Sequence, residues 1–244
     1  MAKGKTDVSV IIPTYMEERH VENCLKSIKD QTFRGKVETI VVDSNSSDNT
    51  RKLARKHADK VINIKQRGVG RGRNVGAKHA KGDILLFVDC DTVLHPQYIS
   101  NLIRFYKKNK CVCVSGSLRA LKSKDIKNRI YGHFHYPFFN IVMKISAKLN
   151  YPMFSTVCCS CKKWAFEELG GFVEEIAIGE DVKFSLGMRR FGKCDIDFSS
   201  IAYSSLRRTE KLGIIGGLSV FFENYYKMIF LKQKPWINDF PHIE

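Results

Sequence analysis

Two pairs of neighbouring acidic residues mark the places where this sequence could bind a metal ion or move a proton. Asp89 and Asp91 follow the apolar run Ile84–Val88, and Glu180 and Asp181 begin a helical pattern. Carboxylates so close together repel each other unless a cation lies between them, and oxygen-only ligands suit Mg²⁺ or Mn²⁺. Each pair also fits a simpler interpretation, because a solvated turn can follow a strand and acids stabilise a helix N-terminus.

The first half of the chain alternates strand and helix patterns at short intervals. Apolar strand patterns cover VSVIIPTY, VETIVVD, KVINIKQ and ILLFV, and helical patterns lie between them. This alternation predicts an α/β fold with a Rossmann-like, mostly parallel central sheet and helices on both faces. Ligands bind outside the carboxyl ends of such strands, where Asp89 and Asp91 lie. A turn over Thr92–Pro96 would let the two carboxylates converge.

A glycine-rich stretch, GVGRGRNVGAKHAKGD, precedes the last of these strands. It predicts a turn followed by a short helix. Gly70, Gly72 and Gly76 would let the backbone approach a nucleotide, and an arginine in this stretch offers a charged fork to base or phosphate oxygens. Arg67 and Arg71 are nearby candidates, although a solvated surface position is the favoured interpretation for each of them.

The composition is that of a globular protein with a basic surface. The chain has 41 Lys or Arg and 25 Asp or Glu residues, and the net charge of +16 attracts nucleic acid, anionic lipid or phosphorylated substrates. Its eight cysteines lack zinc-knuckle spacing, so we expect reduced, small apolar residues. Since no run approaches the roughly 18 to 20 apolar residues of a membrane span, we expect a cytoplasmic protein that is soluble or peripheral.

The sequence resembles family 2 glycosyltransferases with the GT-A fold over roughly residues 7–205. The segments that carry the resemblance, in the order and spacing of the family, are VSVIIPTYMEERHVENCLKSI, IVVDSNSSDNT, GRNVGAKHAKGDILLFVDCDT, WAFEELGGF and GEDVKFSLGMRRFG. The resemblance implies one GT-A domain over residues 1–244, with a nucleotide-sugar-binding half (7–118), an acceptor-binding half (119–206) and a basic-aromatic C-terminal segment (207–244).

For the donor side, the resemblance implies an inverting, metal-dependent transferase that uses a UDP- or GDP-sugar. The residues that it assigns to the donor nucleotide are Pro13, Thr14, Glu17, Asp43, Arg73, Asn74 and Asp89. Asp89 and Asp91 would bind Mn²⁺ or Mg²⁺, with the metal bridging the two phosphates of the donor. Glu17 also fits a first-turn helix acid, and Asp43 also fits a helix cap shared with nearby serines.

For the acceptor side, the resemblance assigns catalytic roles to Glu180 and Asp181. Asp181 would be the base that removes the proton of the acceptor hydroxyl, whereas with a phosphate acceptor it would only orient groups. The sequence departs from the family at Val173, where an acid is common, and Glu174 follows instead. The Q-x-x-R-W signature of processive synthases is absent after Asp181, which implies transfer of a single sugar.

Two stretches, IKNRIYGHFHYPFFNIVMKISAKL and GGLSVFFENYYKMIFLKQKPW, mix aromatic and apolar residues with Lys and Arg. Residues 119–150, around the first stretch, hold seven Lys or Arg and one acid. This composition is typical of helices that lie in a membrane interface, and it predicts an anionic membrane surface and a lipid-linked or polyprenyl-phosphate acceptor as partners. Packing on the core or in a homodimer is the alternative. Arg207 and Arg208 either reach the diphosphate or are solvated.

Two other functional classes also fit parts of the sequence. A nucleotidyltransferase of a sugar phosphate places paired acids on a metal, but it would need a glycine-rich loop with a lysine after the first strand, where this chain has PTYMEE. A nucleic-acid-binding protein would explain the net charge. Because the basic residues form no recognised module, we expect no nucleic-acid partner.

Overall fold

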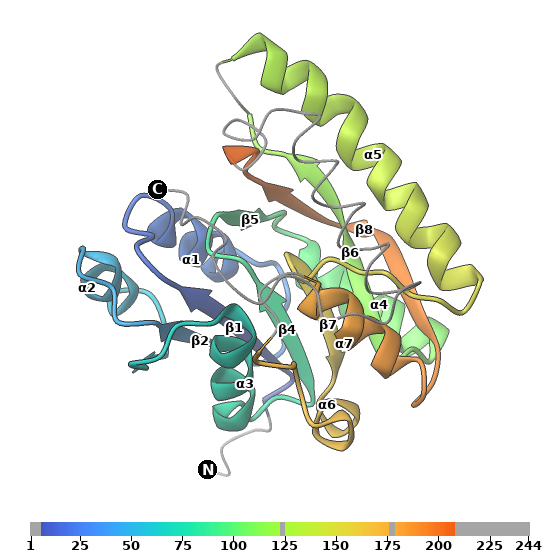
Figure 1. The fold of residues 1–244 in the computed structure, drawn as a ribbon, viewed down its shortest axis with the longest axis horizontal. Helices are drawn as coiled ribbons and strands as arrows, with labels where there is room; N and C mark the ends of the chain where they lie inside the picture. The colour runs from blue at the N-terminus through green and yellow to red at the C-terminus, as the bar shows by residue number, and fades with distance from the viewer. Residues whose placement is uncertain (1–5, 123–124, 176–178, 208–244) are drawn as a thin grey trace.

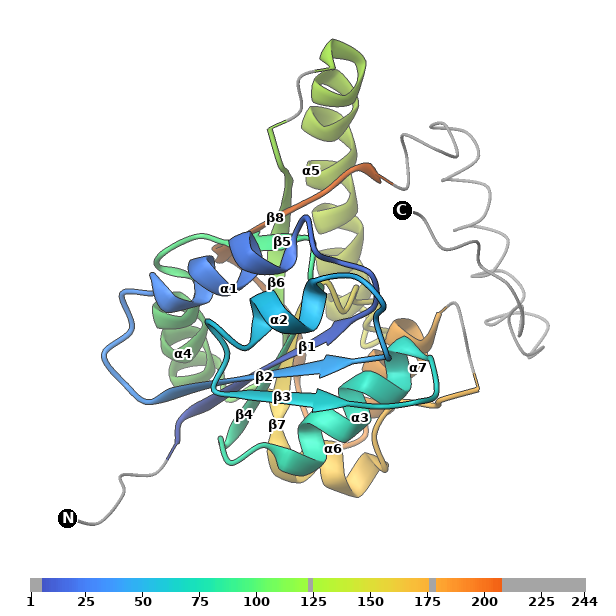
Figure 2. The same ribbon diagram turned by 90° about the vertical axis from the view of Figure 1, so that its left-hand side faces the viewer.

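The computed structural model describes residues 6–122, 125–175 and 179–207, which form a curled mixed sheet with helices on both faces (Figures 1 and 2). The elements in chain order are β1 (Val8–Thr14), α1 (Val21–Lys29), β2 (Val37–Asp43), α2 (Thr50–Ala54), β3 (Lys60–Asn63), α3 (Val69–His79), β4 (Ile84–Val88), β5 (Thr92–Leu94), α4 (Tyr98–Asn109), β6 (Cys113–Ala120), α5 (Ile126–Lys148), β7 (Cys158–Lys162), α6 (Lys163–Leu169), α7 (Glu180–Met188) and β8 (Cys194–Ser204).

The strands lie in the order β3-β2-β1-β4-β7-β6-β8-β5. The predicted parallel arrangement holds from β3 to β4. Beyond β4 the sheet becomes mixed, because β7 runs antiparallel to both β4 and β6, and β5 runs antiparallel to β8. The segment that forms β7 was not predicted as a strand. It is short and buried on both faces, so its sequence shows no alternation of apolar and polar residues.

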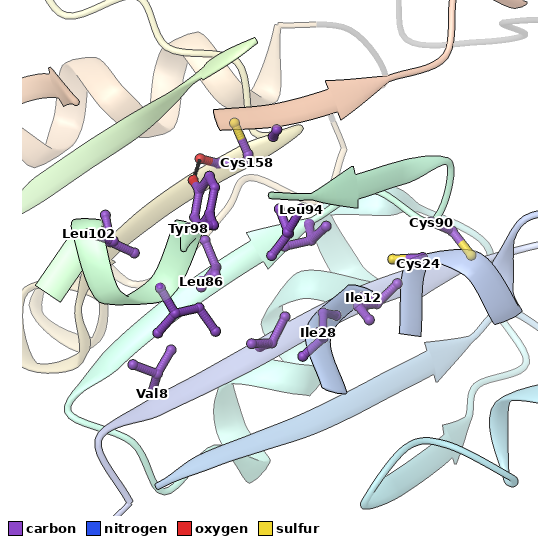
Figure 3. Close-up of a cluster of buried hydrophobic side chains, with 14 of the residues drawn as sticks. Val8, Ile12, Cys24, Ile28, Leu86, Cys90, Leu94, Tyr98, Leu102 and Cys158 are labelled. Carbon is purple, nitrogen blue, oxygen red and sulfur yellow. Dashed lines mark hydrogen bonds between the residues drawn. The ribbon is translucent and has the colours of Figure 1, made fainter. Parts of the chain in front are cut away.

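Two apolar cores cover the two faces of the sheet. Val8 and Ile12 of β1 belong to the core under α1, α2 and α4, whereas Ile11 belongs to the core under α3, α6 and α7. Figure 3 shows the first core, in which Leu86 of β4 and Tyr98 of α4 lie among the packed side chains. Because helices cover both faces, the central strands are continuously apolar, as the sequence predicted.

The parallel strands bring several strand ends to one edge of the sheet. Thr14 at the end of β1 lies in register with Asp43 at the end of β2, and Val88 at the end of β4 is followed directly by Asp89. The chain then turns, since the backbone N–H of Thr92 donates to the carbonyl oxygen of Asp89 at 3.0 Å. The predicted turn is therefore present, but it comes earlier than expected and leads at once into β5.

The predicted short helix in the glycine-rich stretch is present as α3, but Gly70, Gly72 and Gly76 lie within this helix and not in a turn before it. A Cβ at Gly76 would collide with the side chain of Ile11, and a Cβ at Gly72 would lie 3.0 Å from Cβ of Pro13. These glycines therefore let α3 pack closely on β1. The structure shows this packing role, and the close approach of the α3 backbone to a nucleotide stays a prediction.

Helix α5 lies along the outer side of the sheet, against β6 and β8 (Figure 1). Within the described ranges, no helix combines the length and the apolarity that crossing a bilayer requires. All eight cysteines are buried and none is in a disulfide, which agrees with their prediction as packing residues. Apart from Arg207, the predicted segment 207–244 lies outside the described residues, and so does Arg208.

Candidate active site

A buried arginine joins the two predicted acidic pairs. Arg73 of α3 is 2% exposed, and it donates through Nη1 to Oε1 of Glu180 and through Nη2 to Oδ1 of Asp89, both at 2.9 Å. Glu180 is 107 positions from Arg73 in the sequence, so this guanidinium brings the two halves of the predicted site together. Its Nε is a buried donor that has no hydrogen-bond partner among the residues described. The sequence predicts that Arg73 contacts the donor. In the structure, its guanidinium holds the carboxylates of Asp89 and Glu180 in place.

A second arginine binds the remaining acids on the donor side. Arg207, which follows β8, donates from Nη1 to Oε2 of Glu17 at 3.0 Å and from Nη2 to Oε1 at 2.5 Å. Its Nε lies 3.0 Å from Oδ2 of Asp91. A forked contact of this kind is among the stronger ion pairs. The structure therefore places a side-chain cation directly against Asp91, the predicted metal ligand.

This region contains more acidic side chains than basic ones. Its acids in the described part of the chain are Glu17, Asp89, Asp91, Glu180 and Asp181, and the arginines that contact them are Arg73 and Arg207. Carboxylate oxygens are the ligands that Mg²⁺ and Mn²⁺ prefer, and the contact of Arg207 shows that these acids accept a cation. The residues present therefore fit a divalent metal.

A metal held by Asp89 and Asp91 would need further ligands. Among the described residues, no three His, Cys, Asp or Glu side chains are grouped closely enough to hold a metal ion by themselves. The ligands beyond Asp89 and Asp91 would have to come from donor phosphates and water. This arrangement suits a metal that binds together with its substrate.

Asp181 is placed to exchange a proton near neutral pH. Burial and then the neighbouring carboxylate of Glu180 raise the pKa of Asp181 to about 7, while the charge of Arg73 partly opposes the shift. Oδ1 of Asp181 accepts the backbone N–H of Val182 at 2.8 Å, which holds the side chain at the start of α7. A carboxyl group with a pKa near the working pH is suited to general base catalysis.

Asp43 is fully buried, and its neighbours occupy its carboxylate. It accepts hydrogen bonds from Oγ1 of Thr14 at 3.1 Å and from the backbone N–H of Ser46 at 2.9 Å, and Nε of Arg51 lies at 3.4 Å. These contacts order the loop before α2. The alternative of a helix cap is wrong, because α2 begins only at Thr50 and its N-cap residue is Asn49. Its contact with the base or ribose of a donor stays a prediction, as does that of Thr14.

Asn74 fastens the loop after α6 to α3. Its Nδ2 donates to the carbonyl oxygen of Phe172 at 2.9 Å and to Oε1 of Glu174 at 3.0 Å, and its Oδ1 accepts the N–H of Phe172 at 2.8 Å. Arg71 donates to Oε2 of Glu174 at 2.6 Å. In the sequence, Glu174 is only a departure from the family pattern, and no local pattern indicates its partners. The donor contact of Asn74 stays a prediction, because its amide is used here.

One exposed arginine lies on the donor side. The guanidinium of Arg67 lies 4.0 Å from the ring centroid of Tyr15, the residue that follows β1. Stacking of this kind holds a cation at the surface while leaving its N–H groups directed outward. Arg67 is therefore a better candidate for phosphate contact than Arg71, which is paired with Glu174.

The sequence matches a family model and is similar to several known proteins. A family model described as Glycosyl transferase family 2 matches residues 9–170, and the match ends before Glu180. Glycosyltransferase AglE of Haloferax volcanii is 28% identical over 197 residues, which cover 73% of this chain and 60% of AglE. Dolichol-phosphate mannosyltransferase of Pyrococcus furiosus is 33% identical over 127 residues, which cover 50% of this chain and 35% of that protein. The chain thus spans 60% or less of the length of these relatives.

Solved structures share the fold. Residues 1–349 of Staphylococcus aureus TarS in complex with UDP-GlcNAc match with a TM-score of 0.66 and 20% identity, over 82% of this chain and 58% of that one. Mannosyltransferase PcManGT of Pyrobaculum calidifontis in complex with GDP-Man and Mn²⁺ matches with a TM-score of 0.67 and 21% identity, over 91% of this chain and 65% of that one. The predicted GT-A fold is confirmed. Because the family model covers more than half of its residues, the chain belongs to glycosyl transferase family 2.

Proposed function

We propose that this chain is a metal-dependent, inverting glycosyltransferase that moves one sugar from a nucleoside diphosphate sugar to an acceptor. The observation that carries the proposal is the bridge from Asp89 through Arg73 to Glu180, which sets a metal-suited acidic pair beside a carboxyl group suited to take a proton. The neighbours in complex with UDP-GlcNAc and GDP-Man favour a UDP- or GDP-linked donor.

Charge is the argument for a metal. Five acids face only two arginines in this region, so an approaching diphosphate would meet a net negative charge. An additional cation is therefore needed, and Asp89 and Asp91 would hold Mn²⁺ or Mg²⁺. When bound, the metal neutralises charge on the departing nucleoside diphosphate. The Mn²⁺ in the PcManGT complex is consistent with this role.

Asp181 is proposed as the base. It accepts the proton of the acceptor hydroxyl while the acceptor oxygen bonds to the anomeric carbon, and the bond from that carbon to the diphosphate breaks with its electron pair on the leaving group. Attack in line with the leaving group inverts the anomeric centre. Glu180 acts indirectly, by holding Arg73 and by raising the pKa of Asp181. With a phosphate acceptor, no proton is removed and Asp181 orients the acceptor.

The acceptor is proposed to be lipid-linked or a polyprenyl phosphate, and the protein to be peripheral at the cytoplasmic face of a membrane. The net charge of +16 favours an anionic surface. A relative named as a dolichol-phosphate mannosyltransferase supports an acceptor of this class. Nucleotidyl transfer is disfavoured by family membership.

Release of UDP or GDP from a panel of nucleotide sugars, with Mn²⁺ or Mg²⁺ and then with EDTA, tests the proposal. We expect release that requires the metal. Asp91→Ala should abolish release and transfer, and Asp181→Asn should abolish transfer to a hydroxyl acceptor while nucleotide binding is retained. Lys107→Ala, an exposed change on α4, is the control. Chelator-resistant release would refute the metal dependence, and no release from any donor would refute the function.

A further inference from the structure

One face of α5 exposes a continuous row of large apolar side chains. The members of this row, named here the α5 stripe, are each more than 50% exposed and lie three or four positions apart: Ile126, Ile130, Phe134, Phe138, Ile141, Ile145 and Leu149. Residues with this spacing share one side of a helix, so the stripe runs its full length, about 35 Å at 1.5 Å per residue. An exposed apolar patch of this extent marks an interaction site.

The opposite face of α5 is fixed to the sheet. Met143 is buried in one core and Tyr136 in the other. Asn140 is also buried, and its Oδ1 accepts the backbone N–H of Leu118 while its Nδ2 donates to the carbonyl oxygen of the same residue, both at 2.9 Å. Because these contacts fix the rotation of the helix about its axis, the stripe cannot turn inward without breaking them.

Positive charge accompanies the stripe. The sequence of α5 contains four Lys or Arg residues and no Asp or Glu. At its C-terminal end lies a hollow of about 680 Å³ whose lining includes Lys144, Lys148, Arg189 and Lys193. Asp195 also lines this hollow and pairs with Lys144 at 2.6 Å and Lys193 at 3.2 Å, so the basic groups exceed the acid. Basic groups thus lie around the C-terminal end of the helix that carries the stripe.

We infer that the α5 stripe docks the protein on an anionic phospholipid bilayer. The apolar row enters the boundary between headgroups and acyl chains, and the basic residues lie against anionic headgroups. A second copy of the chain is a poorer partner, because two stripes facing each other would oppose Arg129 and Lys148 to like charges with no acid on α5 to pair with them. Docking would bring the site to an acceptor that is held in the bilayer, and this part of the inference rests on the proposed function.

Contacts connect α5 to the candidate active site. Oη of Tyr136 donates to the carbonyl oxygen of Ser205 at 3.3 Å, and Leu206 lies in the same core as Tyr136. The next residue, Arg207, holds Glu17 and Asp91. A bilayer that binds α5 therefore holds the helix against which the Arg207 segment packs.

Co-sedimentation of the full chain with phosphatidylcholine vesicles containing about 30% phosphatidylglycerol tests the inference. We expect the double variant Phe134→Gln/Phe138→Gln to bind these vesicles at least tenfold more weakly than the wild type. The matched double variant Trp164→Gln/Phe198→Gln removes two aromatic side chains that are 51% and 47% exposed outside the stripe, and it should bind as the wild type does. Vesicles without phosphatidylglycerol should bind several-fold less protein.

Each other result of the experiment overturns the inference. Equal vesicle binding by the stripe variant and the wild type would show that another surface docks. If residues 208–244 cover the stripe, the stripe variant would lower the thermal midpoint without reducing vesicle binding. If a second copy covers it, sedimentation equilibrium without vesicles would show a dimer that the variant dissociates. UDP or GDP release without vesicles should be unchanged in the stripe variant. This measurement therefore distinguishes failure of the proposed function from failure of the docking inference.

Discussion

Nε of Arg207 lies 3.0 Å from Oδ2 of Asp91, while the two terminal nitrogens of Arg207 bind Glu17. A side-chain cation therefore lies beside the proposed metal ligand. A divalent ion that binds Asp91 must either replace this contact or share the carboxylate with it. In the first case, Arg207 could turn toward the donor diphosphate, the role predicted for it from the sequence.

Replacing Arg207 by glutamine should tighten the binding of Mn²⁺ to the donor-free protein by roughly tenfold, because a competing positive charge is removed. Turnover of the nucleotide sugar should fall in the same variant. Electron paramagnetic resonance titration of Mn²⁺ measures the first effect without relying on activity. Arg51→Gln is the control, since Arg51 pairs with Asp43. An unchanged Mn²⁺ affinity would show that Arg207 and the metal do not compete.

Arg73→Met should destabilise the fold by about 3–5 kcal/mol, because it leaves Asp89 and Glu180 without their shared buried cation. The side chain of Arg73 is 2% exposed and that of Glu180 10%, so water reaches the Glu180 carboxylate poorly once its partner is lost. Urea unfolding followed by circular dichroism measures the change. Arg71→Met removes an arginine that is 31% exposed and should cost less than about 1 kcal/mol. A similarly small cost for Arg73→Met would mean that the bridge does not hold the site together.

The rate of transfer to a hydroxyl acceptor should rise with pH up to about 7 and then level off, because Asp181 must be ionised to accept a proton. Below that pH the rate should fall about tenfold per unit. Glu180→Gln removes a neighbouring negative charge that raises the pKa of Asp181, so the acid limb should move to lower pH. If the acid side of the pH–rate profile does not move in this variant, a group other than Asp181 controls it.

The same pKa shift predicts how stability depends on pH. Because the pKa of Asp181 is raised in the folded state, the folded state holds this proton more tightly than the unfolded chain does. The resulting stabilisation is present at low pH and is lost as pH rises through about 7. Asp181→Asn removes this dependence, so its thermal midpoint relative to the wild type should be higher at pH 8 than at pH 5. Lys107→Ala should show no such trend.

The sequence predicted the elements whose patterns are local. Strands β1 and β4 were found as apolar runs because they are buried on both faces, and the acids after β4 were placed at a ligand-binding edge because parallel strands share their carboxyl ends. The helix beginning at Glu180 was found from its own pattern. Family resemblance added the reaction class, which no local pattern contains.

The partners of the charged residues could not be predicted in this way. Arg207 and Glu17 are 190 positions apart, and no local rule pairs them. Arg73 was interpreted as a fork for the donor, since an arginine beside glycines fits that role as well as it fits a buried bridge. The resemblance alone assigned Asn74 to the donor, and its contacts to Phe172 and Glu174 depend on how the loop after α6 lies against α3.

The glycines of α3 illustrate the same limit and lead to a further prediction. In Gly76→Ala, the new Cβ would collide with Ile11, and overpacking of this kind costs about 1–3 kcal/mol, more than the roughly 0.5–1 kcal/mol that alanine contributes to a helix. Urea unfolding should therefore show a net loss of stability. Lys78→Ala, at an exposed position on the same helix, should change stability by less than about 0.5 kcal/mol.

Nucleotide affinity separates the two roles that these glycines could have. If Gly76 serves packing, UDP or GDP should bind the folded Gly76→Ala protein as tightly as it binds the wild type, because the clash lies between α3 and β1. Isothermal titration calorimetry at a temperature well below the thermal midpoint measures this affinity. A variant with unchanged stability and weakened nucleotide binding would instead support the role first inferred from the sequence, a close approach of the α3 backbone to the donor.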